Sequence, residues 1–280
     1  MTRRIAGVIG WPVAQSLSPI IHRHWFQEYG IDGDYVALPV APENFSRCVT
    51  ALPLMGFAGA NVTVPHKQAA AALSETLDGD ARKTGAVNLL VFGERGISGA
   101  NTDVQGFLAT LRETLPVDRL AKKPAVVLGA GGAARAILVA LERAGFREIR
   151  IVNRTRERAE AIVAELALPV RCPVHEWGNW TNAFENAGFL VNTTSLGMKG
   201  KAPLELPLDD LSSDAAVADI VYNPVETELL RRAAAGGRET MDGLGMLMHQ
   251  AVPAFAAWFG VTPKVTAELR TKLLQKLARA

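Results

Sequence analysis

Residues 126–135 read VVLGAGGAAR, a short apolar run followed by a glycine-rich turn and a good helix former. The spacing Gly129-x-Gly131-x-x-Ala134 fits the dinucleotide-binding fingerprint. Gly129 permits the tight turn, Gly131 lets the backbone approach a pyrophosphate, and Ala134 allows helix and strand to pack closely. The first N–H groups of the helix would face the anion. The same letters also occur in ordinary turns, but a strand before them and a helix after them favour a dinucleotide site.

The end of the next strand indicates which dinucleotide binds. An NAD enzyme is expected to carry an acidic residue there for the ribose 2′-hydroxyl. This chain instead has Asn153-Arg154-Thr155, followed by Arg158. If the helix has started by Arg154, its guanidinium shares a face with that of Arg158. A solvated basic helix start is the alternative, but positive charge there opposes the helix dipole. Arginines meet phosphate oxygens bidentately, so the pattern predicts NADP.

The bulk composition is that of an ordinary globular protein, with 49% hydrophobic and 21% charged residues among 280. A net charge of +2 gives no case for nucleic acid as a partner. No apolar stretch is long enough for a membrane span or a signal peptide. Cys48 and Cys172 are isolated, and the five histidines show no metal spacing. We therefore expect a cytoplasmic protein without a metal.

The first hundred residues alternate strand and helix patterns, which predicts a mostly parallel α/β sheet. A helix begins near Ser18 and Pro19. The other expected elements are strands 4–10, 34–40 and 59–64, a helix 42–54, an Ala-rich helix after Lys67, and a hairpin of 86–92 with 97–101.

The rest of the chain predicts a second α/β unit with a Rossmann-like sheet. A helix from Thr102-Asp103 to Leu115 leads into a linker over 116–124. Strands are expected at 125–129, 148–152, 169–172, 188–192, 217–221 and 239–241, and helices at 132–144, 157–166 and 182–186. Two final helices, 244–259 and 263–278, have no strand after them. We predict a substrate domain over 1–102, an NADP-binding domain over 103–243, and C-terminal helices over 244–280 that return to the first domain.

Lys67 and Asp103 are the candidates for acid–base chemistry. Lys67 follows the carboxyl end of a predicted strand, where open α/β sheets bind ligands. A solvated lysine and a helix-capping aspartate are the plainer interpretations. Polar residues also stand at the strand ends, and these would converge if the strands are parallel neighbours: Asn61, Thr63, Asn88 and Asn101. A lysine beside an aspartate is a usable proton-transfer pair, because each holds the other charged and in place.

Several motifs, in order along nearly the whole chain, together resemble shikimate dehydrogenases of the shikimate/quinate dehydrogenase family. They are Ser16-Leu17-Ser18-Pro19, the stretch from Asn61 to Lys67, Gly85-Ala86-Val87-Asn88, Asn101-Thr102-Asp103, the glycine turn from Gly129 to Arg135, Asn153-Arg154-Thr155, Asn192 to Met198, Asp219 to Pro224, and Asp242 to Gln250.

The resemblance implies reversible hydride transfer between NADPH and 3-dehydroshikimate, which gives shikimate in aromatic amino-acid (chorismate) biosynthesis. It implies Lys67 and Asp103 as the catalytic pair. It implies substrate contacts from Ser16, Ser18, Thr63, Asn88, Tyr222 and Gln250. Cofactor contacts are expected from Gly129, Ala130, Gly131, Gly132, Ala133, Asn153, Arg154, Thr155, Arg158, Ile220 and Gly243.

Two alternatives stay open at this point. One is a quinate/shikimate dehydrogenase that accepts other alcohols or NAD. Its substrate quinate has one more hydroxyl than shikimate. The arginines at 154 and 158 argue against NAD. A non-catalytic nucleotide-binding regulator could share the fold, but it would not need both Lys67 and Asp103. We expect a monomer or homodimer that binds a small-molecule substrate and neither nucleic acid nor membrane.

Overall fold

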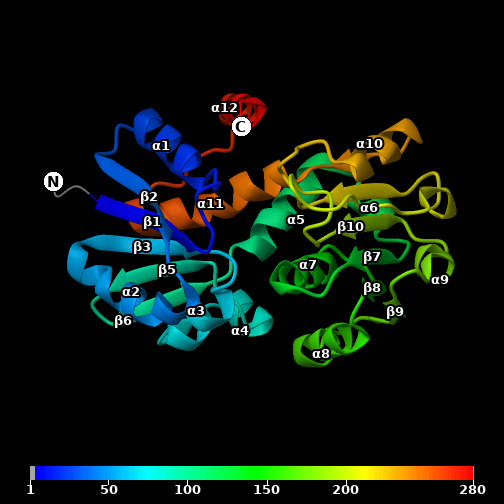
Figure 1. Cartoon of the computed structure of the whole chain (residues 1–280), viewed down its shortest axis with the longest axis horizontal. Coiled ribbons are helices and arrows are strands. Elements are labelled where there is room, and N and C mark those ends of the chain that lie inside the picture. The colour runs from blue at the N-terminus through cyan, green and yellow to red at the C-terminus, as the bar shows by residue number, and fades with distance from the viewer. Residues whose placement is uncertain (1–3, 280) are drawn as a thin grey trace. The chain divides into compact units, whose positions relative to one another are not determined.

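The structure is a computed structural model that describes residues 4–279. The chain forms two compact α/β units (Figure 1). The first comprises residues up to Asp103 together with those from Leu247 onward, and the second comprises Val104–Met246. The chain passes between them within helices α5 (Asp103–Thr114) and α11 (Gly243–Phe259). None of the helices in the described part of the chain is both long and apolar enough to cross a membrane.

The first unit contains a six-stranded sheet in the order β2-β1-β3-β5-β6-β4. Strand β5 pairs antiparallel with both β3 and β6, whereas the other three pairings are parallel. Five of these six strands therefore point the same way, which confirms the mostly parallel sheet. The strands are β1 (Arg4–Gly10), β2 (Gly33–Pro39), β3 (Phe57–Val62), β4 (Thr76–Leu77), β5 (Leu89–Gly93) and β6 (Gly96–Ala100).

The helices of the first unit are mostly short. The helix predicted over 42–54 is divided, because Pro53 has no N–H with which to continue α2. Its pieces are the 3₁₀ helix η1 (Pro42–Asn44), α2 (Phe45–Ala51) and the 3₁₀ helix η2 (Pro53–Met55). The remaining helices are α1 (Ser18–Glu28), α3 (Lys67–Leu73), α4 (Gly79–Thr84) and α12 (Ala267–Ala278).

The side chains of alternate residues of β3 point to opposite faces of this sheet. Ala60 and Val62 enter an apolar cluster with α2, α3 and α4. On the other face α11 packs so closely that a Cβ on Gly59 would lie 2.0 Å from Nε1 of Trp258. That indole N–H donates to the carbonyl of Leu90 at 3.0 Å. Residues 247–259 are therefore part of the first unit's core.

The second unit contains six strands, all parallel, in the order β12-β11-β10-β7-β8-β9. Numbered within this unit, the order is 3-2-1-4-5-6 from the β9 edge, the arrangement of a Rossmann sheet. Strands β7 and β10 are neighbours at the point where the order reverses. The strands are β7 (Ala125–Leu128), β8 (Ile149–Asn153), β9 (Val174–Glu176), β10 (Phe189–Asn192), β11 (Ala216–Asp219) and β12 (Thr240–Met241).

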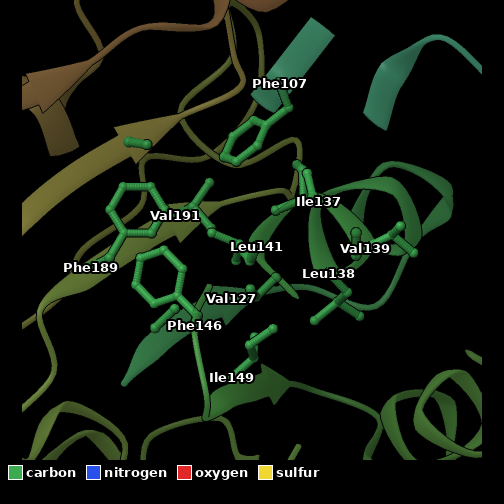
Figure 2. Packing of buried hydrophobic residues seen from close by; sticks show 14 of the residues in the cluster. Phe107, Val127, Ile137, Leu138, Val139, Leu141, Phe146, Ile149, Phe189 and Val191 are labelled. Atoms are coloured by element: carbon green, nitrogen blue, oxygen red, sulfur yellow. The ribbon is translucent and has the colours of Figure 1, made fainter. Parts of the chain in front are cut away.

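Helices cover both faces of the second sheet. Figure 2 shows one face, where Ile137 and Leu141 of α7 (Gly132–Arg143) lie among Val127, Phe146 and Phe189. Helix α8 (Arg156–Leu166) and the apolar residues of α5 belong to the same cluster. The opposite face packs on α9 (Trp180–Phe184), the 3₁₀ helix η3 (Leu208–Asp210) and α10 (Glu228–Ala235).

Some element bounds differ from the sequence prediction. The strand expected over 169–172 is wrong: β9 lies at Val174–Glu176, and Arg171 forms only an isolated bridge with Glu148. Pro169 begins the predicted strand and Pro173 follows it directly. Neither proline has a backbone N–H to donate to a neighbouring strand. The helix predicted over 182–186 is α9, two residues earlier. The linker over 116–124 contains a short helix, α6 (Val117–Leu120).

The last helix begins at Ala267 rather than at residue 263. The side chain of Thr266 accepts a hydrogen bond from the N–H of Leu269 and so caps the helix start. The preceding segment is held differently, because the indole of Trp25 donates to the carbonyl of Lys264 at 3.1 Å.

Candidate active site

Lys67 and Asp103 meet in the first unit. Lys67 begins α3 and Asp103 begins α5, and Nζ of the lysine lies 2.5 Å from Oδ2 of the aspartate. Their side chains are 17% and 8% exposed. A largely buried, charge-assisted hydrogen bond of this kind holds the ammonium in one place. The structure thus brings together two residues that lie 36 positions apart.

Asn88, between α4 and β5, connects this pair to its surroundings. Its Nδ2 donates to Oδ1 of Asp103 and to Oγ1 of Thr102, both at 2.9 Å. Its Oδ1 accepts from the backbone N–H of Thr102 at 2.8 Å. Asn101 supports the same turn, since its Oδ1 accepts from the N–H of Asp103 at 3.1 Å. Both oxygens of the Asp103 carboxylate therefore have donors, which fixes the orientation of the carboxylate.

A second buried chain of polar groups approaches from β2. The hydroxyl of Tyr35 donates to Oδ1 of Asn61 at 2.7 Å, and Nδ2 of Asn61 donates to the carbonyl of Asn88 at 3.0 Å. Burial raises the pKa of Tyr35 well above its usual value, while a hydrogen bond with the Ser18 side chain opposes the rise. Tyr35 is not among the site residues predicted from the sequence. Its only sequence signal is that it is a polar aromatic residue in a predicted strand, and in the sheet β1 separates its strand from the one that carries Asn61.

His22 stacks on this tyrosine, with ring centroids 4.0 Å apart and planes 3° apart. The imidazole is completely buried, and neither ring nitrogen has a hydrogen-bond partner among residues 4–279. Desolvation lowers its pKa to about 3, so the ring is neutral in the folded protein at neutral pH. His22 therefore serves as a neutral aromatic ring that packs against Tyr35.

The other predicted substrate contacts are divided between the units. Ser16 and Ser18 stand at the start of α1, where the N–H of Ser18 contacts Oγ of Ser16 at 3.3 Å. Oε1 of Gln250 lies 3.4 Å from Nδ2 of Asn88. Thr63, just after β3, is half-buried, and its N–H donates to the carbonyl of Ile9. Tyr222 belongs to the second unit, where burial raises its pKa.

The glycine turn of the second unit follows β7. Gly129 has φ +103°, and a Cβ there would lie 2.9 Å from side-chain atoms of both Thr193 and Thr194, which follow β10. A side chain at Gly131 or Gly132 would meet no atom within 4 Å. Helix α7 starts at Gly132 without a side-chain cap. Its first N–H groups thus lack a side-chain cap, and the backbone at Gly131 and Gly132 is open to close approach, which fits an anionic group such as a pyrophosphate.

The arginines after β8 adopt a different geometry from the one expected. Helix α8 begins at Arg156 with Thr155 as its N-cap residue, so Arg154 precedes the helix. The condition under which Arg154 and Arg158 would share a helical face, a helix that has started by Arg154, is therefore not met. Nδ2 of Asn153 donates to the carbonyl of Thr155 at 2.7 Å and holds this turn. Within residues 4–279, Arg154 and Arg158 form no ion pair, whereas Arg156 pairs with Glu160 at 2.7 Å.

A buried aspartate organises the end of β11. Asp219 accepts hydrogen bonds from Nδ2 of Asn192 at 3.0 Å, from the N–H of Val221 at 3.0 Å and from Oγ1 of Thr227 at 2.8 Å. Burial raises its pKa to about 6 in spite of these donors. The turn that it holds carries Ile220, and a Cβ on Gly243 would lie 2.2 Å from the Ile220 carbonyl oxygen. Gly243 is thus required by close packing against that turn.

Comparison with known proteins gives the family. The model of the shikimate dehydrogenase substrate-binding domain matches residues 8–90, and that of shikimate/quinate 5-dehydrogenase matches residues 112–196. The NADP(+) shikimate dehydrogenase of Paramagnetospirillum magneticum is 51% identical over 97% of this chain and 98% of its own. This chain belongs to the shikimate dehydrogenase family. A second relative of the same description, from Acidiphilium cryptum, is 54% identical over 94% of this chain and 92% of its own.

Solved members of the shikimate dehydrogenase family share the fold. Shikimate 5-dehydrogenase from Thermus thermophilus, solved with NADP(H) and shikimate, has a TM-score of 0.83, 35% identity and 99% coverage of both chains. Quinate dehydrogenase from Corynebacterium glutamicum, solved with NAD, has a TM-score of 0.90 and 31% identity over 98% of this chain and 99% of its own. These comparisons confirm the α/β fold class expected from the sequence.

Proposed function

We propose that this chain catalyses the reversible NADPH-linked reduction of 3-dehydroshikimate to shikimate. The observation that carries the proposal is the Lys67–Asp103 pair, joined at 2.5 Å and held by Asn88 in a family whose full-length relatives are NADP(+) shikimate dehydrogenases. The reaction belongs to chorismate and aromatic amino-acid biosynthesis. The enzyme is an oxidoreductase that acts on a CH–OH group.

In this proposal Lys67 supplies the proton. When bound, NADPH provides the hydride that reaches the ketone carbon. The carbonyl oxygen gains negative charge as this occurs, and the Lys67 ammonium donates a proton to it and stabilises the charge. Asp103 holds the ammonium at the required position. In the reverse direction the neutral amine takes the proton from the shikimate hydroxyl, so atoms and charge balance both ways.

Polar groups of the first unit bind the substrate in this proposal. Ser16 and Ser18 stand at the uncapped start of α1, where backbone N–H groups and hydroxyls together suit a carboxylate. Thr63, Asn88 and Gln250, with Tyr222 of the second unit, are the proposed contacts to the ring hydroxyls or the carboxylate. The internal hydrogen bonds of Asn88 leave its orientation defined before the substrate arrives.

The residues of the second unit fit NADP. The N-terminus of α7 and the open backbone at Gly131 and Gly132 suit the pyrophosphate. Arg154 and Arg158, without carboxylate partners, suit the 2′-phosphate. The proposed contacts are Gly129, Ala130, Gly131, Gly132, Ala133, Asn153, Arg154, Thr155 and Arg158, with Ile220 and Gly243 on the nicotinamide side.

A quinate/shikimate dehydrogenase that uses NAD is the alternative, and the solved quinate dehydrogenase is a structural relative. Two features favour shikimate and NADP instead. Asn153 stands at the end of β8 where an NAD enzyme would place an acid, and two arginines that form no ion pair within residues 4–279 follow it closely. Quinate has one more hydroxyl than shikimate, and a different serine/threonine pair could admit it. This chain has serines at both 16 and 18, which favours shikimate.

The cellular setting follows from the proposed reaction. We propose that the enzyme works in the cytoplasm, as a monomer or homodimer, on a small-molecule substrate and without nucleic acid. Size-exclusion chromatography with light scattering would distinguish the two oligomeric states.

The test is a steady-state assay of the purified protein with shikimate or quinate, each with NADP or NAD. We expect the highest kcat/KM for shikimate with NADP. Turnover of neither alcohol would refute the enzymatic function. A higher kcat/KM for quinate with NAD would replace the proposal by its alternative.

A further inference from the structure

Arg154 is held by an aromatic ring rather than by a carboxylate. Its Cζ lies 5.3 Å from the centroid of the Trp177 ring, within the range of a cation–π interaction. Both residues belong to the second unit, where Arg154 follows β8 and Trp177 follows the neighbouring β9. The contact therefore joins the carboxyl ends of two paired strands.

Trp177 is itself fixed to the core of this unit. Its ring meets that of Trp180 edge-on, with centroids 5.2 Å apart, and Trp180 stacks on Phe184 at 5.6 Å. Phe184 is completely buried. The three aromatic residues thus form a ladder from the core to the surface, and the half-buried Trp177 is its outer end.

This arrangement restricts Arg154 before any ligand arrives. A free arginine side chain loses considerable rotamer entropy when it is ordered by a phosphate. Contact with the face of an indole removes part of that freedom in advance, and the edge of the guanidinium keeps its N–H donors for an anion. Arg156 is different, since its guanidinium donates to Glu160. Arg158 has no aromatic partner in the described part of the chain.

We propose that Trp177 is a positioning residue that sets the preference for a 2′-phosphorylated adenosine by holding Arg154. The inference rests on the proposed use of NADP and adds a residue to it. It differs from a role as a platform for the adenine ring, because such a platform would serve NAD and NADP equally. The effect of Trp177 must therefore act on the 2′-phosphate and must require Arg154.

The test is isothermal titration calorimetry with two fragments, adenosine 2′,5′-bisphosphate and adenosine 5′-monophosphate. Trp177→Leu removes the aromatic face, Trp177→Phe keeps one, and each is made with Arg154 intact and with Arg154→Ala. We expect Trp177→Leu to lower the affinity for the bisphosphate about three- to tenfold, which matches a cation–π contact of intermediate strength. Trp177→Phe should lose less. Binding of the monophosphate should be unchanged.

The double mutant gives the sharpest outcome. With Arg154→Ala in place, Trp177→Leu should have no further effect on the bisphosphate. Equal weakening of both fragments, or the same loss with and without Arg154, would overturn the proposal. Unchanged thermal midpoints of the variants would show that the fold is intact, and a shift in tryptophan emission of the free Arg154→Ala protein would report the lost contact. If the wild-type protein does not prefer the bisphosphate, the proposed use of NADP fails instead.

Discussion

The candidate site residues of the two units differ in how their charges are compensated. In the first, Lys67 and Asp103 neutralise each other, and Asn88 fills the remaining acceptor of the aspartate. In the second, Arg154 and Arg158 have no carboxylate partner among the described residues, and α7 starts without a side-chain cap. The charges of the Lys67–Asp103 pair are thus compensated before a ligand binds, whereas the second unit has donors that can bind an anion.

This difference corresponds to what each unit would recognise. A ring with several hydroxyls is recognised by oriented amide and hydroxyl groups of the protein. These protein groups are selective only when other hydrogen bonds fix their orientation. A dinucleotide carries its own negative charge, so cations without carboxylate partners in the protein bind it with the greatest gain. The comparison predicts that mutations in the first unit affect turnover and folding, and those in the second affect cofactor affinity.

The largest effect is expected for Lys67→Ala. Loss of the proton donor should lower kcat with shikimate by about 10²–10⁴, since general acid–base catalysis contributes that much. Stopped-flow or steady-state kinetics would measure it, with the NADP Kd as the control that should not change. A variant that loses shikimate affinity but keeps its turnover rate would contradict the role given to Lys67.

Replacing Arg154 and Arg158 together by alanine should act on the cofactor alone. We expect the KM for NADP to rise about a hundredfold, because at least two charge-assisted hydrogen bonds are lost. The KM for shikimate should change little. Arg156→Ala is the matched control, since this arginine already pairs with Glu160. A parallel rise in the NAD and NADP constants would show that these residues do not read the 2′-phosphate.

Tyr35→Phe should destabilise the first unit. Asn61 would keep a buried oxygen without a donor, so the free energy of unfolding should fall by about 1–3 kcal/mol. Urea unfolding followed by circular dichroism would measure it. Tyr29→Phe is the control, because within residues 4–279 its hydroxyl accepts a single, exposed hydrogen bond, from the N–H of Lys264. An equal fall in the free energy of unfolding in the two variants would mean that the buried Tyr35–Asn61 hydrogen bond contributes no more to stability than the exposed one.

An effect of similar size, which appears only when the pH is changed, concerns His22. Its folded pKa of about 3 lies below the unfolded value of 6.5, so the unfolded chain binds the extra proton. Its contribution to stability is therefore complete above pH 6.5 and is lost as the pH falls toward 3. Between about pH 7.5 and about pH 5, wild type should lose about 2 kcal/mol relative to His22→Phe. A pH-independent difference between the two unfolding free energies would contradict the neutral, buried imidazole.

Much of this architecture could be predicted from the sequence, because glycine and proline mark turns and apolar runs mark buried strands. The glycine turn at 129–131 and the strands around it are where the pattern indicated. The failures lie where strand pairing or a local side-chain hydrogen bond decides. β9 forms beyond Pro173 because its ladder partners on β8 are set by the sheet, and Arg154 precedes α8 because Asn153 bonds to the carbonyl of Thr155.

The candidate site shows the same limit. Lys67 and Asp103 could be selected because charged residues at strand ends are few and chemically distinctive. Tyr35 and Trp177 could not, since an aromatic residue in a strand or loop is usually packing. Their importance comes from which neighbour they meet, Asn61 in one case and Arg154 in the other, and a single sequence does not contain that information.

The most direct test of the central claim is chemical rescue of Lys67→Ala by a small primary amine. The rate of 3-dehydroshikimate reduction would be followed at saturating substrate and NADPH, with increasing methylamine or ethylamine. If a lysine ammonium donates the proton, the rate should rise with amine concentration and should depend on the acidity of the amine. A rate that no amine restores, in a variant that binds shikimate like wild type, would contradict the assignment of Lys67 as the proton donor.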